Sequence, residues 1–351
     1  MESLDLDGML IISESNINYL TGFTGDSSRL LVSEKGCVFL TDGRYTEQAT
    51  NEIHKEIEVF NWINDNRYGV ETYQKFIDGF EIKRLGFESS VMSHSIFQKF
   101  MHGVKNVDMI PTDGLINKLR MIKDVQEIEL LRQACRISDK ALELTLPYID
   151  EGVTEKEISA RLDFHLKMEG ANGISFETII VSGHKTSLLH GHPTHKKLAK
   201  GDFLQVDFGA LYCDYHADMS RTFVIGKASE EQQELYGYIK LAEMEAIKSL
   251  KPGLHGSVPD TVVRNIIPDS YISYYYPGLG HGVGLEIHEE PFIKSPSEFT
   301  FQSGMVVTIE PGVYIPGWGG MRIEDTVLVT DDGYEILTHF PRELMELSTI
   351  D

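Results

Sequence analysis

Two aspartates in the second half of the chain have the spacing of an acidic pair in a β-hairpin. They are Asp207 and Asp218, in the segment V-D-F-G-A-L-Y-C-D-Y-H-A-D-M-S-R-T-F that starts at Val206. A turn centred on Tyr212 and Cys213 would place the two carboxylates directly opposite each other on one face of the ladder. Because like charges in that arrangement are destabilising, the pattern predicts a cation beside the pair.

Two glutamates farther along the chain repeat the pattern. They are Glu310 and Glu324, in the segment T-I-E-P-G-V-Y-I-P-G-W-G-G-M-R-I-E-D-T-V. A turn centred on Gly317 would set them opposite each other. Each carboxylate could singly be a solvated strand or turn residue, and Arg322 could form a structural salt bridge with Glu324. The apolar residues that flank these acids favour the other interpretation, since charges in such surroundings are usually paired or metal-bound.

The chemistry that fits four such carboxylates is that of two divalent cations. Four clustered carboxylates could not all stay ionised unaided, and two divalent ions would balance their charge. His281, in a glycine-rich segment G-L-G-H-G that we expect to form a loop between the two hairpins, offers a nitrogen ligand. The sequence therefore predicts a two-metal hydrolytic site made by Asp207, Asp218, His281, Glu310 and Glu324.

Other histidine and glycine motifs are weaker. The segment P-G-L-G-H-G-V-G-L-E-I-H-E lacks the residues of a phosphate-binding loop, and we expect its glycines to let the backbone pass close to a metal-bound His281. The segment L-L-H-G-H-P-T-H could suggest a zinc site by itself. We expect His190 to face the pocket and His192 and His195 to be ordinary loop residues.

The composition limits the class of protein. The chain has 351 residues, enough for two domains, and a formal net charge of -22, which argues against nucleic acid as a partner. The three cysteines are widely spaced, as in proteins of a reducing compartment. The acidic N-terminus and the lack of any run of ~20 apolar residues predict a cytoplasmic protein that does not engage a membrane.

The elements divide into two parts. In residues 1–112 short apolar strands alternate with turns and helices, which predicts a small α/β domain. We expect strands at G-M-L-I-I, R-L-L-V and C-V-F-L, a turn at S-E-S-N from Ser13, and a helix capped by Thr41 or Asp42. Residues 113–351 combine long helices with the acidic hairpins and predict an α+β domain. A capping box at Thr154 and Glu157 begins one of these helices.

Five sequence blocks together resemble a known family of enzymes. The blocks are H-G with the downstream G-D-F-L-Q-V-D-F-G-A, then D-M-S-R-T-F, G-L-G-H-G-V-G-L-E-I-H-E, T-I-E-P-G-V-Y and G-G-M-R-I-E-D-T-V. In this order they resemble the proline-specific metallopeptidases of the pita-bread fold, the Xaa-Pro aminopeptidases and Xaa-Pro dipeptidases. N-Y-L-T-G-F and T-D-G-R-Y are similar to the creatinase-type N-terminal domain of that family.

The resemblance implies a function and roles for single residues. It implies hydrolysis of an X-Pro bond by a homodimer, with the five predicted ligands holding two ions. His190 and His288 would contact the substrate carbonyl, and Arg322 and Tyr314 would also lie at the site. Family members use manganese, cobalt or zinc, and a mainly carboxylate ligand set favours Mn²⁺. A non-peptidase enzyme or a binding protein on the same fold is the alternative.

One position departs from the family pattern. Members often carry another histidine four residues before the metal-binding histidine, and this chain has Pro277 there. A contact to the substrate would then be missing, or another residue such as Tyr276 would supply it.

Overall fold

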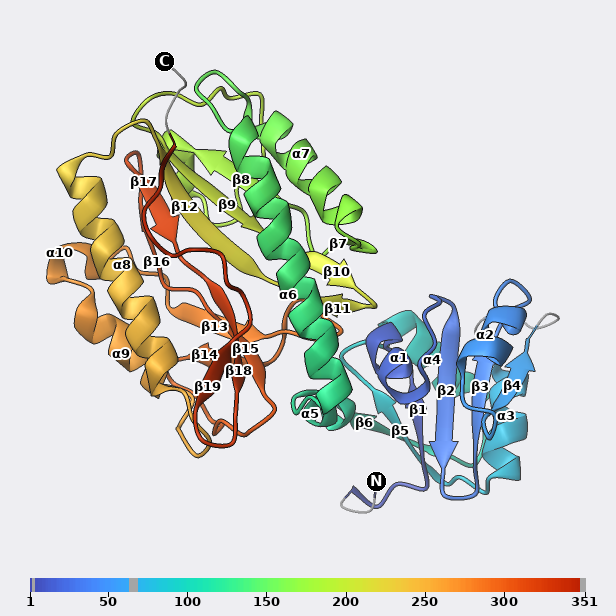
Figure 1. Ribbon diagram of the computed structural model, residues 1–351. Helices are drawn as coiled ribbons and strands as arrows, with labels where there is room; N and C mark the ends of the chain where they lie inside the picture. Colours follow the sequence, from blue (N-terminus) through green and yellow to red (C-terminus); the bar gives the residue numbers. More distant parts are fainter. Residues whose placement is uncertain (2–3, 63–68, 348–351) are drawn as a thin grey trace. The chain divides into compact units, whose positions relative to one another are not determined.

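The chain folds as two units that divide after Arg120. The computed structural model (Figure 1) describes residue 1, residues 4–62 and residues 69–347. The sequence pattern suggested a division near Asp113, and the difference is the short helix α5 (Leu115–Arg120), which belongs to the first unit. The Arg120 guanidinium donates a 2.8 Å hydrogen bond to Asn16 Oδ1 and ties this helix to the first unit.

The first unit is a six-stranded sheet of order β4-β3-β2-β1-β5-β6 with helices on both faces. Alternating residues of β1 point to opposite faces: Leu10 packs in the core with Tyr73 of α3, and Ile11 packs with Ile17 of α1. The predicted α/β organisation is confirmed. The elements are β1 (Gly8–Ile11), α1 (Glu14–Thr21), β2 (Ser28–Ser33), β3 (Gly36–Thr41), α2 (Thr46–Glu52), β4 (Glu58–Asn61), α3 (Val70–Gly79), β5 (Arg84–Glu88), α4 (His94–Gly103), β6 (Asp108–Thr112) and α5.

Two local predictions in this unit are wrong. The segment from Ser13 begins helix α1 instead of forming a turn, because the Ser13 side chain accepts a hydrogen bond from the backbone of Asn16 and caps the helix. Helix α2 begins only after Tyr45 and has no side-chain cap. Thr41 ends β3 and donates to the Ser27 carbonyl at 2.7 Å, while the Asp42 carboxylate accepts from the backbone of Arg44.

The second unit combines antiparallel sheets with long helices. Its larger sheets have the orders β20-β12-β9-β8 and β14-β13-β15-β18-β19. The helices are α6 (Val125–Thr145), η2 (Leu146–Tyr148), α7 (Glu155–Met168), η3 (Gly183–Ser187), α8 (Glu230–Ser249), α9 (Val258–Ile266) and α10 (Asp269–Ile272). The strands are β7 (Gly173–Ile174), β8 (Ile179–Ser182), β9 (Phe203–Phe208), β10 (Ala210–Tyr212), β11 (Tyr215–His216), β12 (Met219–Ile225), β13 (Gly278–Gly282), β14 (Glu289–Lys294), β15 (Val306–Ile309), β16 (Gly312–Ile315), β17 (Gly319–Arg322), β18 (Asp325–Val329), β19 (Tyr334–Ile336) and β20 (Glu346–Leu347).

Two helix layers cover these sheets (Figure 1). Helices α6 and α7 pack on β8, β9 and β12, and α8 and α9 pack on the sheet that contains β13 and β15. The predicted α+β class is confirmed. Helix α7 has the predicted capping box of Thr154 and Glu157, and α6 and α8 have capping boxes of their own. In the part of the chain that the structure describes, no helix has the length and apolarity needed to cross a bilayer.

Candidate metal centre

Asp207 and Asp218 share one face of the hairpin formed by β9 and β12. The predicted register is wrong by two residues, because Asp207 pairs with Ser220 instead of Asp218. The turn lies at Cys213 and Asp214, whose φ angles of 47° and 66° fit a type I′ hairpin turn. A shift of two residues keeps side chains on the same face, so Asp218 still points to the side of Asp207.

The glutamate hairpin has the register that the sequence predicts. Ile309 pairs with Asp325 and Gly312 pairs with Arg322, so the ladder is centred on Gly317. Glu310 and Glu324 therefore occupy corresponding positions where the ladder is interrupted. There the backbone N–H of Glu310 bonds to Leu279 and that of Glu324 bonds to Ser220. The interruption joins this hairpin to β13, which carries His281, and to β12, which follows Asp218 and pairs with the strand of Asp207.

His281 lies on strand β13, so the expectation of a loop at this position is wrong. Its Nε2 atom is 3.5 Å from Asp218 Oδ2 and 3.4 Å from Glu310 Oε1. The neighbouring glycines allow close strand packing: a Cβ atom on Gly280 would lie 2.0 Å from the carbonyl oxygen of Thr308, and one on Gly282 would lie 2.3 Å from that of Glu290. The glycines thus bring other strands close to His281.

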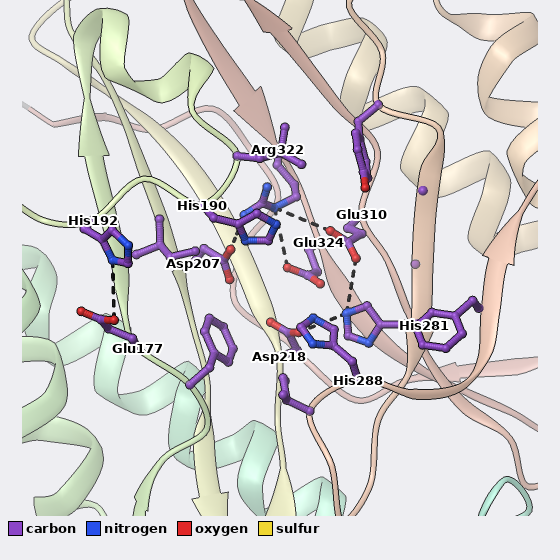
Figure 2. A pocket seen from close by; sticks show the side chains of 18 residues that line it. Glu177, His190, His192, Asp207, Asp218, His281, His288, Glu310, Arg322 and Glu324 are labelled. Carbon is purple, nitrogen blue, oxygen red and sulfur yellow. Dashed lines mark hydrogen bonds and ion pairs between the residues drawn. The ribbon is translucent and has the colours of Figure 1, made fainter. Parts of the chain in front are cut away.

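The five predicted ligands meet on one wall of a cavity. Figure 2 shows their side chains pointing toward one another. Asp207 lies on β9 and His281 on β13, whereas Asp218, Glu310 and Glu324 lie just outside β12, β15 and β18. Ligand atoms of Asp218, His281 and Glu324 lie within 4.8 Å of one another. Glu310 is in contact distance of His281, and Asp207 pairs with Arg322 beside this group. Residues from two strands and from three short gaps between strands therefore converge on a space suited to cations.

The chemistry of this donor set fits divalent metal ions. Asp207 Oδ1 and Asp218 Oδ1 are buried and lack a hydrogen-bond partner within the described protein, which is costly unless a cation is bound. Burial and the neighbouring carboxylates raise the pKa of Asp218 and of Glu324, and burial raises the pKa of Glu310 to about 7. Burial also lowers the pKa of His281 to about 3, so that its imidazole is neutral and able to bind a metal.

Arg322 is enclosed by the carboxylates and organises them. Its guanidinium bonds to Asp207, to Ser220 Oγ at 2.8 Å and to Tyr314 Oη at 2.5 Å. Ser220 in turn donates to Glu324 Oε2 at 2.7 Å. No sequence pattern points to Ser220, whose role follows from its position opposite Asp207. The Tyr314 hydroxyl accepts a hydrogen bond from Arg322, and Tyr314 does not line the cavity.

Among the described residues, three histidines besides His281 line the cavity, and one of them, His192, was expected to be an ordinary loop residue. His190 and His288 line the cavity, and the ring of His288 lies 4.4 Å from that of His281 between centroids. Burial lowers the pKa of His288. His195 is an exposed loop residue outside the cavity. His192 is also exposed, but it reaches the cavity and lies 3.6 Å from Glu177.

A buried glutamate holds the loop that carries His190. Glu155, at the start of α7, accepts hydrogen bonds from Ser182 N and Oγ at 2.9 Å and from Thr194 N and Oγ1 at 2.9 and 2.7 Å. Lys185 forms an ion pair with the same carboxylate. Because these partners lie on both sides of His190 in the sequence, Glu155 fixes both ends of its loop.

Comparison with known proteins identifies the family. The family model of metallopeptidase family M24 matches residues 129–331, and that of the creatinase/prolidase N-terminal domain matches residues 1–122. This chain belongs to metallopeptidase family M24. It is 36% identical to the Xaa-Pro dipeptidase of Pyrococcus horikoshii, over 98% of this chain and 96% of that protein.

Solved structures of M24 relatives share the fold. The Xaa-Pro dipeptidase from Bacillus anthracis superposes with a TM-score of 0.94 at 37% identity, covering 98% of this chain and 96% of that one. The X-Pro aminopeptidase from Thermotoga maritima gives a TM-score of 0.90 at 36% identity, with coverage of 98% and 99%. The chain thus has the pita-bread fold and is a metallopeptidase that acts on peptides.

Several other residues that line the cavity of this M24 protein were not predicted from the sequence, with the exception of Tyr276. The cavity has a volume of about 410 Å³, and Phe176, Glu177, Tyr276 and Phe292 also line it. Their segments carry no shared motif, so only the fold brings them together. Pro277, the departure from the family pattern, is exposed and lies between the lining residues Tyr276 and Gly278 without lining the cavity itself.

We expect the substitution Gly280→Ala to disrupt the M24 site through packing alone. The added methyl group would overlap the Thr308 carbonyl and force β13 away from β15, which should lower the free energy of unfolding by about 2 kcal/mol and weaken metal binding. Gly237→Ala is the matched control. Gly237 lies in α8, where an added Cβ would meet no atom within 4 Å apart from the nearby backbone of its own helix, so the substitution should stabilise the protein by up to about 1 kcal/mol. Chemical denaturation and metal titration measure both effects. Wild-type stability and metal affinity in Gly280→Ala would contradict the packing argument.

Proposed function

We propose that this chain is a two-metal peptidase that hydrolyses the peptide bond between an N-terminal residue and proline. The observation that carries the proposal is the buried group of Asp207, Asp218, His281, Glu310 and Glu324 at one wall of a cavity. These residues would hold two divalent cations. Bound cations would supply Lewis acidity and a hydrolytic nucleophile near neutral pH.

The side chains around these ligands have separate tasks in the proposed reaction. His190 and His288 would donate hydrogen bonds to the substrate carbonyl oxygen as negative charge develops on it. The Glu310 carboxylate would carry a proton to the departing proline nitrogen. Arg322 would keep the Asp207 carboxylate oriented, with Tyr314 and Ser220 fixing the guanidinium in turn.

The preference for proline rests on the relatives and on the shape of the cavity. Relatives that match almost the full chain are named as Xaa-Pro dipeptidases or X-Pro aminopeptidases. Apolar lining residues such as Phe176 suit a pyrrolidine ring. Because these relatives are named as peptidases, they favour this activity over a non-peptidase enzyme or a binding protein on the same fold.

Mn²⁺ is the proposed metal because four of the five ligands are carboxylates; Co²⁺ and Zn²⁺ are the alternatives. The decisive experiment is a product assay on Ala-Pro, Ala-Pro-Ala and longer X-Pro peptides, each with Mn²⁺, Co²⁺ or Zn²⁺ added to metal-depleted protein. Release of the N-terminal residue from X-Pro peptides, with no release from matched X-Ala peptides, is the expected result. Equal turnover of X-Ala peptides would refute the proline preference, and no turnover with any metal would refute the peptidase.

The family likeness also supports a homodimer, and the cysteines support a cytoplasmic location. Cys37, Cys135 and Cys213 are free thiols in the structure, as expected for a reducing compartment. Sedimentation equilibrium should give the mass of two chains. Cell fractionation should recover the protein with cytoplasmic markers.

A further inference from the structure

The described residues that line the cavity include many more acidic than basic side chains. Among the described residues that line it, Arg322 is the single lysine or arginine. Its guanidinium is 4% exposed and is already bonded to Asp207, Ser220 and Tyr314. The four predicted carboxylate ligands balance two divalent cations, and Glu177 adds a further negative charge at the lining. The described cavity therefore offers no unoccupied side-chain cation to a substrate.

An aromatic residue, Phe292, lines the cavity beside the predicted ligand His281. Phe292 lies on β14 directly opposite His281 of β13, so the two side chains share a face of the sheet. Phe292 is 42% exposed and lines the cavity, as does Tyr276, which is 50% exposed. Exposed aromatic rings at the lining of a peptide site provide apolar surface that a bound chain can cover.

We infer that this site selects peptides that continue beyond proline and disfavours free X-Pro dipeptides. The inference rests on the proposed function. In a dipeptide the carbon next to the scissile nitrogen carries a free carboxylate, and the described residues that line the cavity offer it no unoccupied lysine or arginine. In a longer peptide that carbon carries a neutral amide, and each further residue moves the terminal charge about 3.3–3.6 Å outward. The following residue can then pack on Phe292 and Tyr276.

The direct test compares Ala-Pro with Ala-Pro-NH2, which differ in the carboxylate alone, on the metal-loaded enzyme. We expect kcat/KM to be higher for the amide by about ten-fold or more. Ala-Pro-Ala should be cleaved at least as well as the amide. Product inhibition gives a second readout that does not depend on how fast Ala-Pro or Ala-Pro-NH2 is cleaved. Prolinamide should inhibit more strongly than proline.

Phe292→Arg should reverse the preference, because it places a guanidinium opposite His281 on an exposed strand position. The expected result is an increase of about ten-fold in kcat/KM for Ala-Pro, a smaller change for the amide, and stronger inhibition by proline. Phe292→Gln is the matched control, since it removes the ring without adding charge and should not improve Ala-Pro. Phe292→Lys is a second cationic variant should the arginine disturb folding.

The outcomes separate this inference from the proposed function. If the wild type cleaves Ala-Pro as efficiently as Ala-Pro-NH2, the selection for longer peptides is overturned and X-Pro hydrolysis stands. An equal increase of kcat/KM for Ala-Pro in Phe292→Gln and in both cationic variants would also overturn this selection, because the added charge would then have no effect. If no X-Pro substrate of any length is cleaved, both the inference and the proposed function fail.

Discussion

Asp218→Asn should abolish peptidase activity and remove the effect of metal ions on thermal unfolding. Asp218 is buried within reach of His281 and Glu324, and its Oδ1 atom has no hydrogen-bond partner in the described protein. Replacing one oxygen by an amide nitrogen turns an anionic ligand into a neutral one that binds a divalent cation poorly. The loss of activity should exceed the ~10²–10³-fold effect of removing a single oxyanion contact.

In metal-free protein, Asp218→Asn should not lower the free energy of unfolding, although the substitution abolishes activity. Without cations the four carboxylates repel one another, so removal of one charge should leave the metal-depleted variant at least as stable as the metal-depleted wild type. Saturating Mn²⁺ should stabilise the wild type by about 2.7 kcal/mol at one hundred times the dissociation constant, and it should hardly change the variant.

Elemental analysis and thermal unfolding with and without Mn²⁺ measure both effects. Asp332→Asn, a substitution at an exposed turn, is the matched control and should behave as the wild type. Full metal loading and an unchanged response to Mn²⁺ in Asp218→Asn would remove Asp218 from the proposed ligand set.

His190→Ala and His288→Ala should each lower kcat by about 10²–10³-fold while metal stays bound. Both residues line the cavity, and neither belongs to the predicted set of metal ligands. Their loss would remove a donor to the carbonyl oxygen where negative charge develops, which reduces kcat and kcat/KM together.

Metal content is the readout that assigns these roles. His190→Ala is the cleaner variant, because the ring of His288 contacts the proposed ligand His281. His195→Ala, outside the cavity, is the matched control and should retain full activity. Loss of metal from His190→Ala, with activity restored by excess Mn²⁺, would move His190 into the ligand set.

Local sequence patterns determined the helices with strong caps and the glutamate hairpin. The capping box at Thr154 and Glu157 forms as predicted, and so does the register centred on Gly317. The aspartate hairpin was placed two residues out of register, because its turn uses positive φ angles at Cys213 and Asp214. Aspartate tolerates that conformation better than most residues, but cysteine gives no such signal.

The sequence by itself determined which residue types could bind cations and which family they resemble. Tertiary structure decided what surrounds them: Ser220 between Arg322 and Glu324, Glu155 at both ends of the His190 loop, and Phe292 opposite His281. The physical reason is the range of the interactions. Caps, turns and strand alternation depend on residues a few positions apart, whereas a cavity wall depends on packing between segments far apart in the sequence, and no local pattern records that packing.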